Sequence, residues 1–159
     1  MKKLNLIICG LFTLIASANA TTWSKGKKKD PLTGKSVVSN EIRSYGTYIY
    51  RWPSKYDLVF WPLTSPAWIC FNQENGYCAF NGDFEKLSEE EKTKLGEWLK
   101  KNYDPAKPPK TFKDKLDWMM KVYRQRDKND DFWCRYYRLL AYTYRKEPEK
   151  SLIYVKKAI

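Results

Sequence analysis

The chain of 159 residues is strongly basic: 30 lysines and arginines oppose 18 acidic residues, and the net charge at pH 7 is +12. It has no histidine, so it lacks the commonest general base, the usual partner of a nucleophilic serine or cysteine, and the commonest metal ligand, and most hydrolase triads are excluded. Its seven tryptophans and twelve tyrosines can fill the core of one domain, and their polar atoms also suit them to binding surfaces.

The first twenty residues have the pattern of an export signal. Lys2 and Lys3 form a positive start, residues 4–16 are mostly apolar, and Ala18-Asn19-Ala20 is a small-x-small cleavage site. The apolar run is shorter than the roughly 20 residues that a membrane-spanning helix needs, and no second such run follows. We therefore expect residues 1–20 to be a signal peptide, the mature protein to be periplasmic or secreted, and no membrane span to remain after cleavage.

A basic, flexible arm is predicted at residues 21–29. This stretch is polar and contains four lysines between Lys25 and Lys29, which is typical of a solvated arm that packs against little. The next residues, Asp30-Pro31-Leu32-Thr33-Gly34, combine a short acidic side chain, a proline and a glycine, and they predict a turn that ends the arm.

Short irregular strands are predicted in a small aromatic head at residues 30–84. The stretch contains β-branched and aromatic runs, such as residues 47–50 and 58–61, separated by prolines and glycines. Its tryptophans are expected in the core of the head or at its interface with the rest of the chain. They are Trp52, Trp61 and Trp68.

Helical periodicity begins after the head and predicts a helical tail at residues 85–159, so the expected class is α+β. Ser88 with Glu91 forms a capping box, and the helix that follows should end near Asn102. Three prolines make residues 104–110 a stiff linker. The apolar stripe of this helix consists of Leu95, Trp98 and Leu99.

Three further helices are predicted after the linker. Thr111 with Asp114 repeats the capping box, Asn129 caps the next helix, and Pro148 opens the last. Such helices are not stable alone, so each is expected to bury its apolar stripe against a neighbour. The expected stripes are Phe112, Leu116, Met119 and Tyr123; Trp133, Tyr136, Leu140 and Tyr144; and Leu152, Val155 and Ile159.

The last helical hairpin carries small and large residues at Leu140, Ala141, Tyr144, Ser151, Val155 and Ala158. This pattern resembles a tetratricopeptide repeat, in which small residues let paired helices approach closely and large ones fill the gap. The alternative interpretation is a generic helical hairpin.

A wider resemblance extends from Asp30 to the end. The segments at residues 30–34, 44–56 and 70–84 resemble a bacterial family numbered 2225 among domains of unknown function. This resemblance implies a zinc-ribbon-like head with two Cys-x-x-Cys pairs, a tetratricopeptide-like tail, and no attached enzymatic reaction.

The chain departs from that family at the metal-binding positions. Asp30 and Thr33 stand where the first cysteine pair is expected, and Cys70 and Gln73 where the second is expected. One thiolate with one aspartate cannot hold a closed tetrahedral zinc ion. We therefore expect a degenerate ribbon with no metal and no cofactor.

Cys70 and Cys78 are the candidates for a disulfide in the exported protein. Asn75-Gly76 turns the chain back between them, and a loose loop would allow a bridge. If Asn75-Gly76 instead forms a tight two-residue turn, Cys78 lies opposite Gln73 and a bridge is disfavoured. The sequence leaves both arrangements open. Cys134 is expected to be a small buried thiol, since no histidine can activate it.

The favoured function is a non-catalytic binding or scaffold protein of the bacterial envelope. Its helical tail would present an aromatic and basic surface to a protein partner. We expect no enzymatic activity and no small-molecule cofactor. The candidate surface residues are Tyr123, Arg124, Arg126, Arg135, Tyr137 and Arg138.

Two other functions remain open. The first is binding of an acidic envelope polymer or nucleic acid through Lys25 to Lys29 and the lysines between Lys107 and Lys115, although export argues against nucleic acid as the partner. The second is a secreted hydrolase that uses a pair of carboxylates. Its candidate acids, Asp57, Asp83 and Glu85, have no spacing that shows convergence.

Overall fold

The computed structural model describes residues 21–45 and 55–159. The predicted signal at residues 1–20, the expected strand at 47–50 and Trp52 lie outside the described residues. The described chain is an α+β structure with a helical C-terminal part, which confirms the predicted class. Its strands and α-helices are β1 (Thr21–Lys29), β2 (Ser36–Tyr45), α1 (Lys55–Phe60), β3 (Ile69–Phe71), β4 (Cys78–Phe80), α2 (Glu89–Asn102), α3 (Phe112–Tyr123), α4 (Asp130–Thr143) and α5 (Pro148–Lys157).

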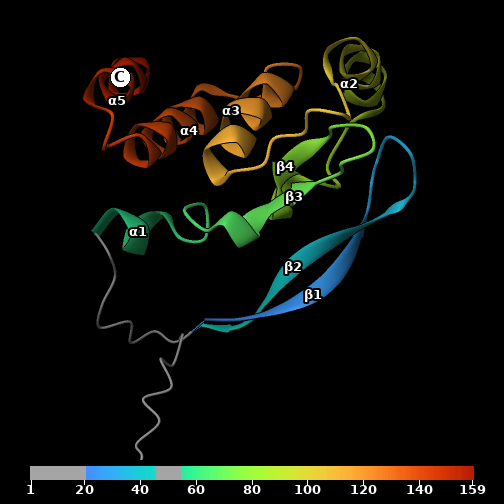
Figure 1. Cartoon of the computed structure of the whole chain (residues 1–159), viewed down its shortest axis with the longest axis horizontal. Coiled ribbons are helices and arrows are strands. Elements are labelled where there is room, and N and C mark those ends of the chain that lie inside the picture. The colour runs from blue at the N-terminus through green and yellow to red at the C-terminus, as the bar shows by residue number, and fades with distance from the viewer. Residues whose placement is uncertain (1–20, 46–54) are drawn as a thin grey trace, which may run out of the picture.

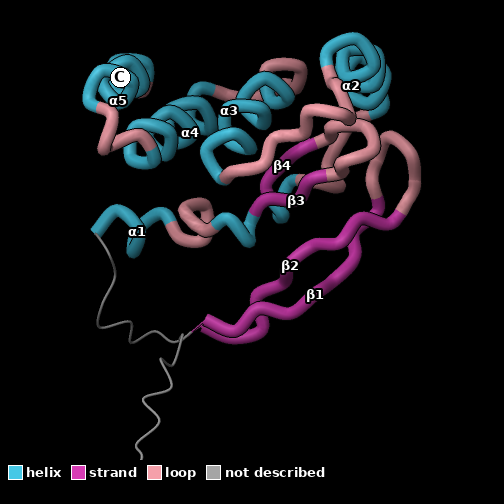
Figure 2. The backbone as a smooth tube through the Cα atoms, in the orientation of Figure 1, coloured by secondary structure: helices cyan, strands magenta, loops and turns pink. Residues whose placement is uncertain are grey.

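The elements are arranged in three tiers (Figure 1). Helices α2 to α5 form the first tier, and α5 lies at its end. The β3–β4 pair and α1 lie beneath these helices, and α3 packs on β4. The long β1–β2 hairpin forms the third tier and contacts the second through β2 and β3 (Figure 2).

The predicted flexible arm at residues 21–29 is wrong, because this segment is strand β1. It pairs antiparallel with β2 from Thr21 opposite Tyr45 to Lys29 opposite Ser36. Its polar composition reflects an exposed two-stranded ribbon, in which Lys25, Lys27 and Lys29 alternate along the strand with exposed side chains. The predicted turn at residues 30–34 joins the two strands, and Gly34 adopts the left-handed conformation there, with φ of 70°.

Residues 58–60 do not form the predicted strand, because they belong to helix α1. Tyr56 and Phe60 are four residues apart, so a helix places both rings on one face. The rings stack with centroids 4.1 Å apart, and Tyr56 also stacks on Tyr142 of α4 at 4.5 Å. Packing against α4 thus selects a helix from a run whose composition favours a strand.

The predicted caps of the helical tail are confirmed. Ser88 and Glu91 form a capping box at α2, and Thr111 and Asp114 form one at α3. The side chain of Asn129 accepts a hydrogen bond from the amide of Phe132 and caps α4. These local hydrogen bonds fix where each helix begins.

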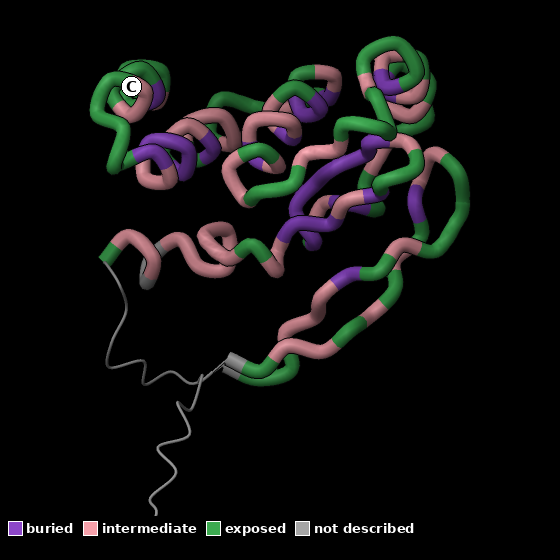
Figure 3. Tube along the Cα trace, viewed as in Figure 1, coloured by how far each residue is buried: buried purple, intermediate pink, exposed green. Residues whose placement is uncertain are grey.

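Head and tail share one hydrophobic core, which contains both strands β3 and β4 and the inner faces of the helices (Figure 3). Buried tyrosines satisfy their hydroxyl groups within it. The Tyr77 hydroxyl donates to the Phe84 carbonyl at 2.8 Å, the Tyr136 hydroxyl donates to the Leu116 carbonyl at 2.7 Å, and the Tyr123 hydroxyl accepts from the Phe80 amide at 3.0 Å. These tyrosines therefore fill the core with their rings while their hydroxyl groups hydrogen-bond to the backbone.

We predict that Tyr123→Phe lowers the free energy of unfolding by about 1–2 kcal/mol, because it leaves the buried Phe80 amide without its acceptor. Tyr137→Phe is the matched control: its hydroxyl has no hydrogen bond to the described residues, and we expect a change below about 0.5 kcal/mol. Urea unfolding of both variants measures the difference. Equal losses in the two variants would contradict the assigned role of the Tyr123 hydroxyl.

Candidate binding surface

The six residues predicted as a binding surface do not form one surface. Tyr123 is fully buried and Arg126 is 6 % exposed, so neither can contact a partner. Tyr123 belongs to the apolar stripe predicted for its helix, and α3 packs that stripe against β4 of the head. Arg126 lies beyond the end of α3, and its buried position depends on acids far away in the sequence, which helical periodicity does not indicate.

Arg126 pairs with acids from two other segments. Its guanidinium lies 3.0 Å from Asp83 and 3.3 Å from Glu91, and it donates to the Lys86 carbonyl. Burial opposes ionisation of Glu91, but hydrogen bonds from the Ser88 amide and the charge of Arg126 outweigh it and hold the pKa of Glu91 below its ordinary value. Arg126 is therefore a structural cation at the junction of head and tail.

The other four predicted residues are separated along α3 and α4. Arg124 is exposed, and Arg135 is exposed and pairs with Asp131 one turn earlier at 3.1 Å. The Tyr137 ring is half-buried and stacks between Trp133 and Tyr154. Arg138 lies with its guanidinium 4.8 Å from the centre of the Phe60 ring, and it lines a groove.

That groove, about 580 Å³ in volume, lies between α1, α4 and α5, and we call it the tail groove. Its lining is mostly apolar, with the guanidinium groups of Arg138 and Arg145 beside it. Arg145 lies over the Tyr142 ring at 4.1 Å and donates to the Tyr142 carbonyl, so its charge is held in place. The residues of the tail groove are Tyr56, Cys134, Arg138, Ala141, Tyr142, Arg145, Ser151, Val155, Ala158 and Ile159.

The apolar stripe predicted for the last helix exists but is not buried. Leu152 is 53 % exposed, Val155 is 42 % exposed, and Ile159, just beyond α5, is fully exposed. The inner face of α5 instead carries Tyr154, which stacks on the rings of Tyr137 and Tyr144.

Two hydrogen bonds hold α5 in the orientation that turns Tyr154 inward. The Ser151 hydroxyl donates to the Ala141 carbonyl at 2.9 Å, and the Cys134 thiol donates to the Ala158 carbonyl at 3.2 Å. Small residues therefore lie between α4 and α5, as the repeat-like pattern predicts. The stripe of Leu152, Val155 and Ile159, which we call the α5 stripe, is left facing away from that contact, and Val155 and Ile159 continue into the tail groove.

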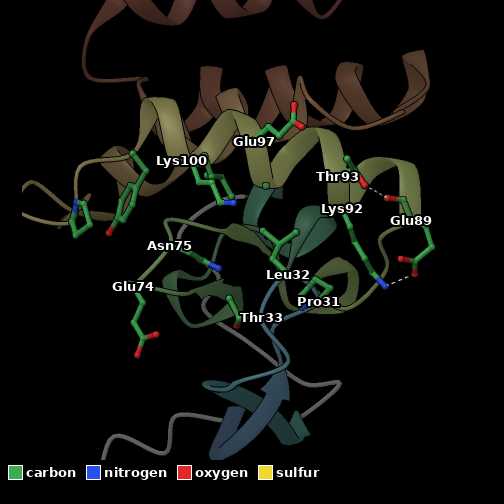
Figure 4. A pocket seen from close by; sticks show the side chains of 14 residues that line it. Pro31, Leu32, Thr33, Glu74, Asn75, Glu89, Lys92, Thr93, Glu97 and Lys100 are labelled. Atoms are coloured by element: carbon green, nitrogen blue, oxygen red, sulfur yellow. Dashed lines mark hydrogen bonds and ion pairs between the residues drawn. The ribbon is translucent and has the colours of Figure 1, made fainter.

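A second concave region of about 850 Å³ lies between α2 and the turns of the head (Figure 4). Its charged side chains are of both signs, and Lys92 pairs with Glu89 at 2.6 Å. Such a lining favours no single charge on a ligand. We therefore place the candidate binding surface at the tail groove and the α5 stripe.

Cys70 and Cys78 are free thiols in the described structure, and neither arrangement left open by the sequence is present. Cys78 lies opposite Phe71, and Cys70 lies opposite Ala79. Since neighbouring residues of a strand point to opposite faces, the two sulfurs lie on opposite sides of the β3–β4 pair and cannot bridge. Burial raises the pKa of Cys70 to about 12 and the pKa of Cys78 further still.

The three acids considered for hydrolysis are engaged in different structural contacts. Asp83 pairs with Arg126 and with Lys128, and Asp57 accepts a hydrogen bond from the Tyr142 hydroxyl. Glu85 accepts from the Lys29 amide at 3.0 Å and from the Lys28 ammonium at 3.2 Å, which lowers its pKa and disfavours a role as general acid.

The two predicted lysine clusters differ in how free their charges are. On β1, Lys25, Lys27 and Lys29 are exposed. In the second cluster Lys107 and Lys110 are exposed, whereas Lys113 pairs with Glu147 and the Lys115 ammonium lies 5.8 Å from the centre of the Phe71 ring. The hairpin carries its exposed lysines at alternate positions of one strand and is therefore the more regular surface for an anionic polymer.

Comparison with known proteins finds no matching protein-family model, no similar curated protein and no similar solved structure. The resemblances to the 2225 family and to tetratricopeptide repeats remain predictions from sequence. Within residues 21–45 and 55–159, no helix has the length and apolar character that crossing a membrane requires.

We predict that, in the folded chain at neutral pH, iodoacetamide modifies Cys134 well before Cys70 and Cys78. Cys134 lines the tail groove, whereas the two head thiols are buried with raised pKa values and little reactive thiolate. Peptide mass mapping after timed labelling measures the order. A head peptide that resists alkylation under denaturing conditions until it is reduced would reveal a disulfide and contradict the free-thiol assignment.

Proposed function

We propose that this chain is an exported, non-catalytic binding protein of the bacterial envelope, and that its tail binds a protein partner through the α5 stripe and the tail groove. The observation that carries the proposal is the exposure of Leu152, Val155 and Ile159 beside a groove flanked by arginines. Export itself rests on the signal-like sequence of residues 1–20.

Energetics favour a protein partner on this surface. Removing an exposed aliphatic side chain from water gains about 1–2 kcal/mol. Leu152 and Val155 are three residues apart on α5, and Ile159 lies just beyond its C-terminal end, so a second helix laid along α5 and past that end can contact all three. Apolar faces of this kind, rimmed by polar groups, are typical of interaction sites.

Charge defines the partner segment further. Arg138 and Arg145 lie beside the groove, and Lys156 and Lys157 end α5. A segment with an apolar face flanked by aspartate or glutamate would match this arrangement. We therefore propose an acidic, amphipathic helix of another envelope protein as the bound element, in the helix-in-groove mode.

Non-catalytic binding also agrees with the state of the predicted acids. Asp57, Asp83 and Glu85 each hold another part of the fold, and histidine is absent from the sequence. Binding of this kind needs no reacting group and depends on an apolar surface that is exposed to water.

The test is capture from an envelope extract by the full chain, compared with Val155→Ser/Ile159→Ser. We expect wild type to retain a partner above about 200 mM salt, because apolar contacts are little screened, and the double variant to retain at least about tenfold less, which corresponds to about 1.4 kcal/mol. Val38→Ser is the matched control, since Val38 is 63 % exposed on β2.

Arginine variants separate the rim from the apolar stripe. Arg138→Glu/Arg145→Glu should weaken capture and make it less dependent on salt, whereas Arg124→Glu should leave it unchanged, because Arg124 is exposed outside the tail groove. If wild type and Val155→Ser/Ile159→Ser capture the same proteins in the same amounts, the proposal is contradicted. Loss of every captured species at moderate salt, with dependence on Lys25, Lys27 and Lys29 instead, would support the polyanion alternative.

A further inference from the structure

Two turns of the head have the same sequence pattern and the same hydrogen bonds. The first is Asp30-Pro31-Leu32-Thr33-Gly34-Lys35, between β1 and β2, and the second is Asn72-Gln73-Glu74-Asn75-Gly76-Tyr77, between β3 and β4. Each has polar side chains at its first and fourth positions and a glycine at its fifth. Both glycines are left-handed, with φ of 70° and 81°.

The side-chain bonds of the two turns correspond. At the first position, the side-chain oxygen accepts from the amide two residues later: Asp30 from Leu32 at 2.7 Å and Asn72 from Glu74 at 2.9 Å. At the fourth position, Thr33 accepts from the Lys35 amide at 3.3 Å and Asn75 from the Tyr77 amide at 2.9 Å.

The backbone bonds correspond too. In each turn the glycine amide donates to the first carbonyl at 2.8 Å, and the first amide donates to the sixth carbonyl at 2.8 Å. Four matching bonds in each turn make the two turns equivalent in local conformation, although 42 residues separate Asp30 from Asn72.

The Asp30 carboxylate joins the two turns. It is fully buried, and its Oδ2 accepts from the side-chain amide of Asn72 and, at 2.7 Å, from that of Asn75. At the surface the Lys35 ammonium adds an ion pair with Glu74 at 2.7 Å. Figure 4 shows the two turns side by side, with Leu32 and Thr33 from one and Glu74 and Asn75 from the other.

We infer that Asp30, Thr33, Asn72 and Asn75 occupy the four positions that thiolates would hold around a structural metal ion, and that the Asp30 carboxylate cross-links the turns in the place of that ion. Asn72 and Asn75 of the second turn are thus equivalent to Asp30 and Thr33 of the first. The hydrogen-bond pattern favours this pair over Cys70 with Gln73, the pair that the family resemblance implies, because Cys70 lies in β3, before the turn.

The residues present do not fit zinc. Zinc in structural sites takes thiolate and imidazole ligands, whereas these four positions offer one carboxylate, one hydroxyl and two amides. The carboxylate already accepts three hydrogen bonds. Among the described residues, no group of three or more histidine, cysteine or acidic side chains is placed to hold a metal. The head therefore folds through hydrogen bonds to Asp30 and is independent of metal supply.

The decisive experiment installs cysteine at the four positions of the full chain: Asp30→Cys, Thr33→Cys, Asn72→Cys and Asn75→Cys. Purified with zinc, this variant should bind one zinc ion per chain and give the absorption of a tetrahedral thiolate site when cobalt replaces zinc. The matched control combines Asp30→Cys, Thr33→Cys and Gln73→Cys with the native Cys70, and it should hold less than about a tenth as much zinc.

Wild type should contain no tightly held zinc, and chelator should not move its melting temperature. One zinc ion per wild-type chain, or preferential binding by the Cys70 and Gln73 set, would overturn the inference. If the four-cysteine variant does not fold, Asp30→Asn still tests it: this change should lower the melting temperature by roughly 5–10 °C, and the exposed control Asp127→Asn should not. No shift with Asp30→Asn would equally overturn it.

Discussion

The Arg126 ion pairs are the interaction on which the arrangement of head and tail depends. Arg126 lies in the turn after α3, and its side chain reaches Asp83 after β4, the Lys86 carbonyl, and Glu91 in the first turn of α2. A buried guanidinium without partners is strongly unfavourable. The three segments are therefore held at one point, and the position of α2 relative to α3 follows from it.

Glu91 shows how local and tertiary constraints coincide at this point. One of its oxygens accepts from the Ser88 amide in the capping box, and the other accepts from Arg126 and from the Asp127 amide. The residue that starts α2 thus also ties α2 to the loop after α3. Because the head fixes α2 and α3, the later helices extend away from it, and α5 ends the row with an uncovered stripe.

Sequence patterns that span only a few neighbouring residues predicted the helix starts and the turn at residues 30–34 correctly. The capping residues Ser88 and Thr111 and the turn at residues 30–34 were placed correctly, because their hydrogen bonds are local. The helical tail followed from its periodicity for the same reason.

Features decided by distant packing were not predictable in this way. The strand β1 depends on pairing with β2, helix α1 depends on stacking of Tyr56 on Tyr142, and burial of Arg126 depends on acids 35 and 43 residues away. The α5 stripe was recognised, but its exposure depends on Tyr154 filling the inner face. Of the six predicted binding residues, Arg138 lies at the candidate site. Arg126 was predicted with it but is buried at the junction of head and tail, because charge and aromatic content alone do not distinguish the rim of a groove from such a junction.

The most direct test of this account is hydrogen exchange of the full chain carrying Arg126→Met, followed by mass spectrometry of peptides from β3–β4 and from α3–α4. We expect both regions to lose protection together, by about 3 kcal/mol, because Arg126 makes head and tail one cooperative unit. Arg124→Met, an exposed arginine on the same segment, should change neither region. Full protection of α3–α4 in Arg126→Met, with loss confined to β3–β4, would contradict the account and show that the two parts fold independently.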